Sequence, residues 1–124
     1  MVPSFSCIHF VDFSRFAAAP VTSSPETKVF DVSIGDIVSK EAFLSVLAKA
    51  MCFPDYFGMN WDALDECMRD LERKGATAFV LVVHEAEKGW TRIPRLLGTF
   101  VEVWLSAADQ WAAESVGFHL IFVW

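Results

Sequence analysis

The stretch FPDYFGMNWDALDECMRDL, residues 53–71, decides how the middle of the chain folds. Pro54 is expected to end a preceding helix, because the residue before a proline avoids the α region. Residues 57–60 are typical of a turn, and Asn60 is a good N-cap for a new helix. Apolar residues then recur at i, i+3, i+4 and i+7, which predicts a helix with one buried stripe. The stripe consists of Leu64, Cys67, Met68 and Leu71.

The opposite face of this predicted helix is acidic. At about 100° per residue, Asp62, Glu66 and Arg69 point away from the apolar stripe, with Asp65 and Asp70 on the flanks. Like charges one turn apart, such as Asp62 and Glu66, destabilise a helix by roughly 0.2–0.5 kcal/mol. Six acids and one base lie between residues 55 and 72, a net charge of −5. This segment therefore holds nearly all of the chain's formal charge of −6.

The flanking segments alternate between strand and helix patterns. Residues 28–34 alternate with a period of two, residues 76–83 form a continuous apolar run, and residues 118–124 end the chain as a third strand. Ser39 is expected to cap a helix that follows it. The apolar row of that helix is Phe43, Val46, Leu47 and Ala50.

Two further helix boundaries are predicted. Gly75 is expected to end the helix that Asn60 begins. Residues 91–113 are helical in pattern, and Pro94 and Gly98 suggest a short helix followed by a longer one. The candidate core row of this region is Leu96, Phe100, Trp104 and Ala107.

Helices between strands predict an α/β fold with a three-stranded parallel sheet flanked by helices. Residues 27–124 are assigned to this domain. Residues 1–26 are assigned to an N-terminal extension, because a Pro/Ser/Thr-rich loop follows the loosely alternating FSCIHFVDF. That short segment is a possible extra strand along a sheet edge.

Composition and charge limit the classes of partner and function that the chain can have. The chain has 124 residues, 54% of them hydrophobic, which predicts one packed domain. Its negative charge disfavours nucleic acid and anionic membranes and favours a basic protein partner. The cysteines are expected to be buried reduced thiols in a reducing cytoplasm. No signal peptide is expected, since the first basic residue is Arg15, and no apolar run is long enough to span a bilayer.

Residues 53–71 resemble the signature of the barstar family, intracellular inhibitors of secreted microbial ribonucleases of the barnase type. In the family pattern an apolar residue, Pro, an acid, an aromatic pair, Gly and Asn precede Asp-Ala-Leu, and Cys and Leu follow. Residues 53–64, Cys67 and Met68 match these positions. The resemblance implies an inhibitor that plugs the enzyme's active site, a monomer when free, with no cofactor or metal.

The resemblance also implies a binding surface. Asp62 and Glu66 would take the place of RNA phosphates against Arg and Lys of the enzyme, and Tyr56 would be an aromatic anchor. A tight complex whose association rate falls with salt is expected. The predicted partner-binding residues are Asp55, Tyr56, Phe57, Gly58, Asn60, Trp61, Asp62, Asp65, Glu66 and Arg69.

The chain departs from the family pattern at several of these positions. Glu66 stands where Asp is typical, Asp65 stands where Trp is common, and Phe57 lacks a hydroxyl. Arg69 is expected to pair with Glu66 or to meet an acid on the partner. A supporting acid from the later helix is expected to be Asp109 or Glu114. These differences predict a partner that differs in detail from the type enzyme.

Two other functions compete with this interpretation. A small enzyme would use His84 at the end of the central strand, or Asp62 and Glu66 as an acid/base pair. No catalytic motif is present, and the predicted acidic face is convex. His9 and His119 lie in apolar strand patterns, isolated in sequence, and Trp90 and Trp104 are expected to be packing residues. The other alternative is a generic acidic interaction module whose basic partner is not a nuclease.

Overall fold

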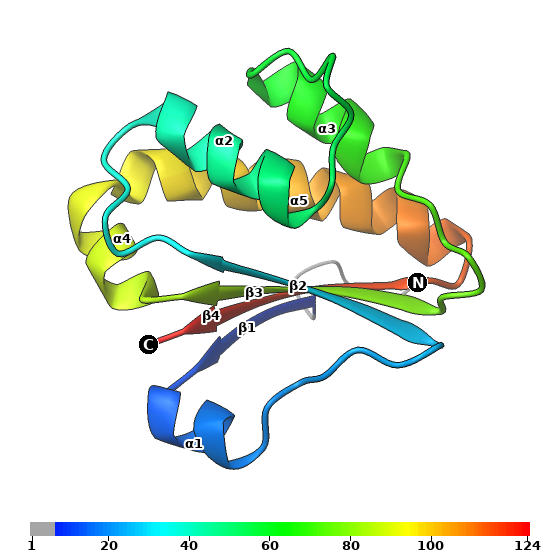
Figure 1. The fold of residues 1–124 in the computed structure, drawn as a ribbon, viewed down its shortest axis with the longest axis horizontal. Helices are drawn as coiled ribbons and strands as arrows, with labels where there is room; N and C mark the ends of the chain where they lie inside the picture. Colours follow the sequence, from blue (N-terminus) through cyan, green and yellow to red (C-terminus); the bar gives the residue numbers. More distant parts are fainter. Residues whose placement is uncertain (1–6) are drawn as a thin grey trace.

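A computed structural model describes residues 7–124, and the first six residues of the predicted extension lie outside the described range. Its centre is a four-stranded sheet in the order β1-β4-β3-β2 (Figure 1). Its strands are β1 (Ile8–Val11), β2 (Thr27–Ser33), β3 (Ala78–His84) and β4 (Gly117–Val123). All neighbouring strands are parallel, as predicted. The predicted number of three strands was wrong, because β1 pairs with β4 along an edge.

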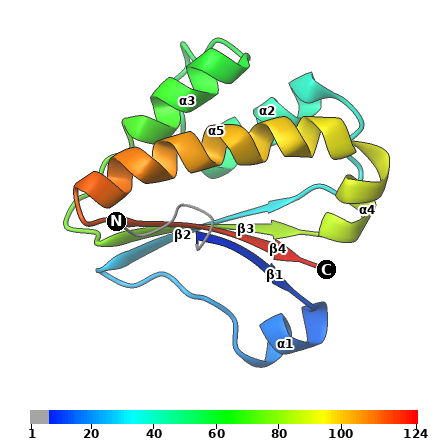
Figure 2. The ribbon, with the colours of Figure 1, turned by 180° about the vertical axis from the view of Figure 1, so that it is seen from behind.

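Helices cover the two faces of the sheet unequally. The helices are α1 (Phe13–Ala18), α2 (Lys40–Ala50), α3 (Trp61–Arg69), α4 (Ala86–Arg92) and α5 (Pro94–Ala113). In both views α2, α3 and α5 lie on one side of the sheet and α1 lies on the other (Figures 1 and 2). Within residues 7–124, no helix combines the length and apolar character needed to cross a bilayer.

The main core lies between the sheet and α2, α3 and α5. Its interior strands supply Phe79, Leu81, Phe118 and Leu120, which are all buried. Trp104 of α5 is fully buried, stacks on Phe118 at a ring-centroid distance of 4.0 Å, and donates its indole N–H to the Phe118 carbonyl. Strand β3 is buried on both faces, with Phe79 and Leu81 in this core and Val80 and Val82 on the other side of the sheet, which explains the continuous apolar pattern of residues 76–83.

The helical region after β3 breaks at Ile93, where Pro94 begins α5, so the predicted break at Pro94 is confirmed. Gly98 lies inside α5 and breaks nothing. Leu97 rather than the predicted Leu96 is fully buried. The restart at Pro94 sets the phase of the helix, and Leu97, Phe100 and Trp104 then follow at helical spacing.

Helix α3 ends earlier than its sequence pattern predicts. It stops at Arg69, with Asp70 as C-cap, so the prediction that Gly75 ends it was wrong. Asp70 and Glu72 would lie at the negative end of the helix dipole, which disfavours extending it. The chain instead reverses through Lys74 and Gly75, both of which have positive φ.

The second face of the sheet carries a smaller core of Val80, Val82, Ile121 and Val123, covered by Phe16 of α1 and other partly buried residues. All three histidines of the chain lie on this face. His9 pairs in register with Ile121, and His119 precedes Ile121 by two positions in β4. The ring centroid of His84 lies 5.5 Å from that of Phe16. The face is therefore polar at its margins and apolar at its centre.

This arrangement predicts an acid-sensitive stability. Burial, followed by the charge of His9, lowers the pKa of His119 from its ordinary value of 6.5. The unfolded chain therefore takes up a proton at a higher pH than the folded chain. The free energy of unfolding should fall as the pH drops below 6.5, and should level off below the folded-state pKa. Urea unfolding between about pH 5 and 8 measures this. His119→Gln should flatten the profile, and an unchanged profile would contradict the assignment.

The cysteines differ from the prediction in part. All three are free in the described structure, but only Cys7 is buried, while Cys67 is half-buried and Cys52 is exposed. Cys52 lies just past the end of α2 with φ 57°, in the turn that leaves the core. Burial raises the pKa of the Cys7 and Cys67 thiols.

Candidate partner-binding surface

The start of α3 is fixed by Asn60, as predicted. Its side-chain oxygen accepts from the N–H of Ala63 at 2.8 Å, and its amide nitrogen donates to the Gly58 carbonyl at 3.1 Å. Leu64 and Met68 are fully buried beneath the helix. One side chain therefore caps the helix and holds the preceding turn at the same time.

The acidic face of α3 is open to solvent. Asp62 and Glu66 are both exposed, one turn apart, which puts their Cβ atoms about 5–6 Å from each other. Within residues 7–124, neither carboxylate takes part in a hydrogen bond or ion pair. Asp55, in the loop before the helix, is exposed as well. Their charges are therefore available to a partner.

The three aromatic residues of the predicted surface have different roles. Tyr56 is 84% exposed. Phe57 is half-buried, and its ring centroid lies 5.2 Å from that of Phe53. Trp61 is half-buried as well, with a ring-centroid distance of 6.5 Å to Phe43. Tyr56 is thus the ring that projects, whereas Phe57 and Trp61 attach the loop and the helix to the core.

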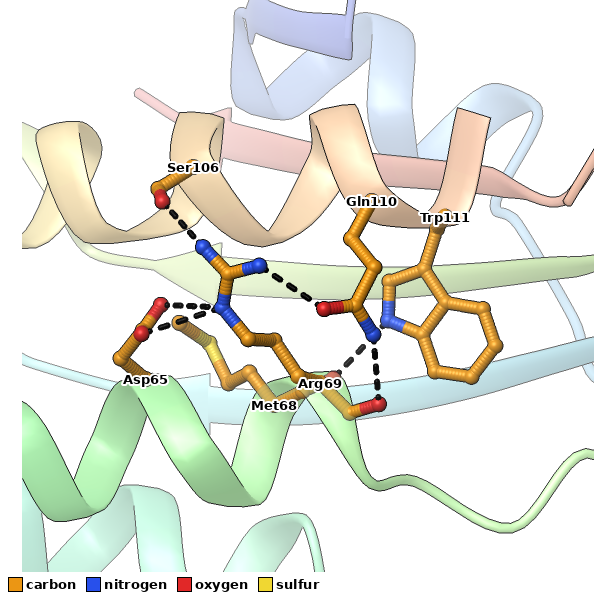
Figure 3. Close-up of polar contacts among 6 residues, drawn as sticks. All are labelled: Asp65, Met68, Arg69, Ser106, Gln110 and Trp111. Carbon is orange, nitrogen blue, oxygen red and sulfur yellow. Dashed lines mark hydrogen bonds and ion pairs between the residues drawn. The ribbon is translucent and has the colours of Figure 1, made fainter. Parts of the chain in front are cut away.

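Arg69 does not make the expected pair with Glu66. Its Nε donates instead to the carboxylate of Asp65 at 3.0 Å (Figure 3). The other expectation, that Arg69 meets an acid on the partner, stays a prediction. The other guanidinium nitrogens donate to Ser106 and Gln110 of α5. The arginine side chain is long enough to reach the side of α3 that faces α5, where α5 supplies neutral hydrogen-bond acceptors.

The contact between α3 and α5 contains two more hydrogen bonds (Figure 3). The amide of Gln110 donates back to the Arg69 carbonyl at 3.2 Å, and the indole of Trp111 donates to the Met68 carbonyl at 2.9 Å. Both carbonyls belong to the last turn of α3, where carbonyl groups have no N–H partner within the helix itself. This α5 brace, made of Ser106, Gln110 and Trp111, fixes the carboxyl end of the acidic helix.

We expect Arg69→Ala to lower the free energy of unfolding by roughly 1–2 kcal/mol. The variant loses a partly exposed ion pair and two hydrogen bonds to α5. Arg15→Ala is the matched control, since the Arg15 side chain is 84% exposed and its ion pair is with Asp12, the N-cap of α1. Denaturant unfolding measures both variants. Equal effects at the two positions would show that the brace contributes nothing.

Asp109 and Glu114, the acids of the later helix that are predicted to support the contact with the partner, lie outside this brace, and their role toward a partner stays a prediction. Asp109 lies close enough to Cys7 to help raise its pKa, on the flank of α5 toward the first described residues. Glu114 is the C-cap of α5. Polar neutral residues, Ser106 and Gln110, occupy the contact with α3. Sequence spacing could not identify them, because their partner Arg69 is distant in the chain.

A hollow of about 770 Å³ lies beside the acidic helix, between α3, the loop before it and the edge strand β2. Glu66 lies on its wall, so the acidic face is not wholly convex as predicted. Asp62 is not among the lining residues, so the two acids do not share the hollow as a catalytic pair would. The lining residues include Lys28, Phe30, Phe53, Tyr56, Glu66 and Asp70.

His84, the histidine of the enzyme alternative, has structural partners. The Nε2 atom of His84 lies 2.9 Å from Asp31, and Phe16 meets its ring edge-on. In the described part of the chain, no three His, Cys, Asp or Glu side chains cluster closely enough to hold a metal ion.

Together these features define an α/β protein that presents an acidic helix and a loop with a projecting aromatic ring. Contacts with α5 and with the core hold the helix and the loop in place. The comparison with protein families agrees with that class: the model described as Barstar (barnase inhibitor) matches residues 27–123, most of the chain. The chain therefore belongs to the barstar family, whose members are inhibitors and not enzymes. A comparison with curated proteins found no match.

Proposed function

We propose that this protein inhibits a basic ribonuclease of the barnase type by inserting α3 and the loop before it into the active site. The observation that carries the proposal is the pair Asp62 and Glu66. Both carboxylates are exposed, have no hydrogen-bond or ion-pair partner within residues 7–124, and lie on a helix that is held at both ends. In the complex they occupy the positions of RNA phosphates. The Arg and Lys residues that bind those phosphates then pair with carboxylates instead.

The charge distribution supports this role. Asp55, Asp62 and Glu66 are all exposed, and the segment from 55 to 72 holds a net charge of −5. A basic cleft attracts such a surface at long range, which raises the association rate. Asp65 differs from these three acids, because Arg69 already neutralises it. We assign Asp65 and Arg69 the role of holding α3 in place.

The stiffness of the surface supports the same role. Asn60 fixes the amino end of α3, the α5 brace fixes the carboxyl end, and Phe57 and Trp61 anchor the loop and the helix to the core. Little conformational freedom remains to be lost on binding, and preorganisation of this kind increases affinity. Tyr56 is the exception, since its exposed ring gains burial only against a partner.

We also propose that the protein acts in the cytoplasm and protects the cell that makes it from its own ribonuclease or from a related toxin. A generic acidic module on the same fold is the second candidate, favoured only by the departures at Asp65 and Glu66. The two candidates differ in where the partner is bound. An inhibitor covers the phosphate-binding residues of a nuclease, whereas a generic module binds any basic surface.

Competition with a nucleotide tests the proposal. A fluorescent nucleoside 3′-phosphate is bound in the active site of a barnase-type ribonuclease, and the protein is then titrated in. Full displacement at one molar equivalent is the expected result. Binding to the ribonuclease that leaves the nucleotide in place would overturn active-site blocking, and so would a failure to bind the ribonuclease at all.

A further inference from the structure

Two histidines separated by 110 residues meet on the second face of the sheet. The Nε2 atom of His9 in β1 lies 3.1 Å from the Nδ1 atom of His119 in β4. Their ring centroids are 5.3 Å apart, and the rings are tilted by 33°. Both side chains are half-buried, so water reaches them. Neither residue belongs to the acidic surface of α3.

The distance between the nitrogens suits a shared metal ion. Two nitrogens bound to one tetrahedral ion at about 2.0–2.1 Å lie roughly 3.3 Å apart. The observed 3.1 Å, which is a hydrogen bond between the two rings in the free chain, is shorter by a few tenths of an ångström. A bound ion would replace this hydrogen bond, with both rings turned so that their lone pairs meet at the ion.

The chemistry of the two side chains favours the same kind of ion. Neutral imidazole is the commonest metal ligand among side chains. It suits zinc, nickel and copper rather than magnesium or calcium.

We propose that His9 and His119 form a two-histidine site for a late first-row divalent metal ion such as Zn²⁺ or Ni²⁺. No third protein ligand joins them within the described residues, so water fills the remaining coordination positions. The affinity is accordingly lower than that of a closed structural zinc site with four protein ligands.

The site would connect a part of the chain that the family match does not cover. Strand β1 precedes residues 27–123 and attaches to the rest of the sheet only through β4. An ion held by His9 and His119 joins these two strands. Because the ion binds only when β1 is in place, it stabilises the attachment of that edge strand.

Calorimetric titration of the full chain with Ni²⁺, free of any histidine tag, tests the site. Ni²⁺ is preferred to Zn²⁺ as the probe because the exposed thiol of Cys52 attracts zinc. Binding of one ion per chain is expected. His9→Gln and His119→Gln should each weaken it by about tenfold or more. His84→Gln is the matched control and should bind as the wild type does, since its Nε2 already meets Asp31.

Thermal unfolding without metal establishes that each variant is folded. Imidazole NMR of the wild-type chain gives a second readout that needs no variant, because Ni²⁺ should broaden the signals of His9 and His119 before those of His84. The proposal is overturned if the wild type binds no ion, if both His9→Gln and His119→Gln bind normally, or if His84 broadens first.

Discussion

Asp62→Ala and Glu66→Ala are each expected to weaken the complex with a barnase-type ribonuclease by about 2–5 kcal/mol. Each removes a carboxylate that would be buried against a cation of the enzyme, and the enzyme's charge is then left unpaired. Both side chains are exposed, and neither forms an ion pair with any of the residues that the structure describes, so the free energy of unfolding should change by no more than about 0.5 kcal/mol. Isothermal titration and urea unfolding measure the two quantities.

Glu87→Ala is the matched control for these two variants. Glu87 is an exposed acid in the first turn of α4, so its removal changes the net charge equally without altering α3. Its affinity should stay close to that of the wild type. If Asp62→Ala or Glu66→Ala unfolds the protein while leaving the complex intact, the acids are structural and the proposed surface is wrong.

Leu64→Ala should have the opposite pattern, with a loss of about 2–5 kcal/mol in the free energy of unfolding. Leu64 is fully buried beneath α3, where it joins the main core. Truncation leaves a cavity that a braced helix closes only in part. The acids above it are unchanged, so the molecules that remain folded should bind the partner normally.

Leu71→Ala provides the comparison for Leu64→Ala. Leu71 was assigned to the same apolar stripe, but it lies beyond the end of α3 and is only half-buried. Its truncation should cost clearly less stability, as measured by the same urea unfolding. A Leu64→Ala variant as stable as the wild type would mean that the buried face of α3 has been assigned wrongly.

The local features of the fold could be predicted from the sequence because short-range chemistry determines them. The caps at Ser39 and Asn60 each need only a side-chain acceptor three residues before a free N–H, and both form as expected. The parallel sheet follows from helices that lie between strands. The acidic face follows from helical spacing, since Asp62 and Glu66 lie opposite Leu64 and Met68.

The features that were missed depend on contacts distant in sequence. Nothing in residues 60–72 shows that α5 offers Ser106 and Gln110 to the guanidinium of Arg69. Nothing in FSCIHFVDF indicates that His9 meets His119 across two strands. The early end of α3 was missed because the apolar stripe continues to Leu71. Extending the helix that far would place acids at the negative end of its dipole, which is unfavourable.

Titration of the catalytic activity of a barnase-type ribonuclease tests the central claim most directly. The wild-type chain, the double variant Asp62→Ala/Glu66→Ala and the control Glu87→Ala are each added to the enzyme while RNA cleavage is followed. The wild type and the control should abolish cleavage at one molar equivalent, and the double variant should not. Stoichiometric inhibition by the double variant, or cleavage unaffected by the wild type, would contradict the account.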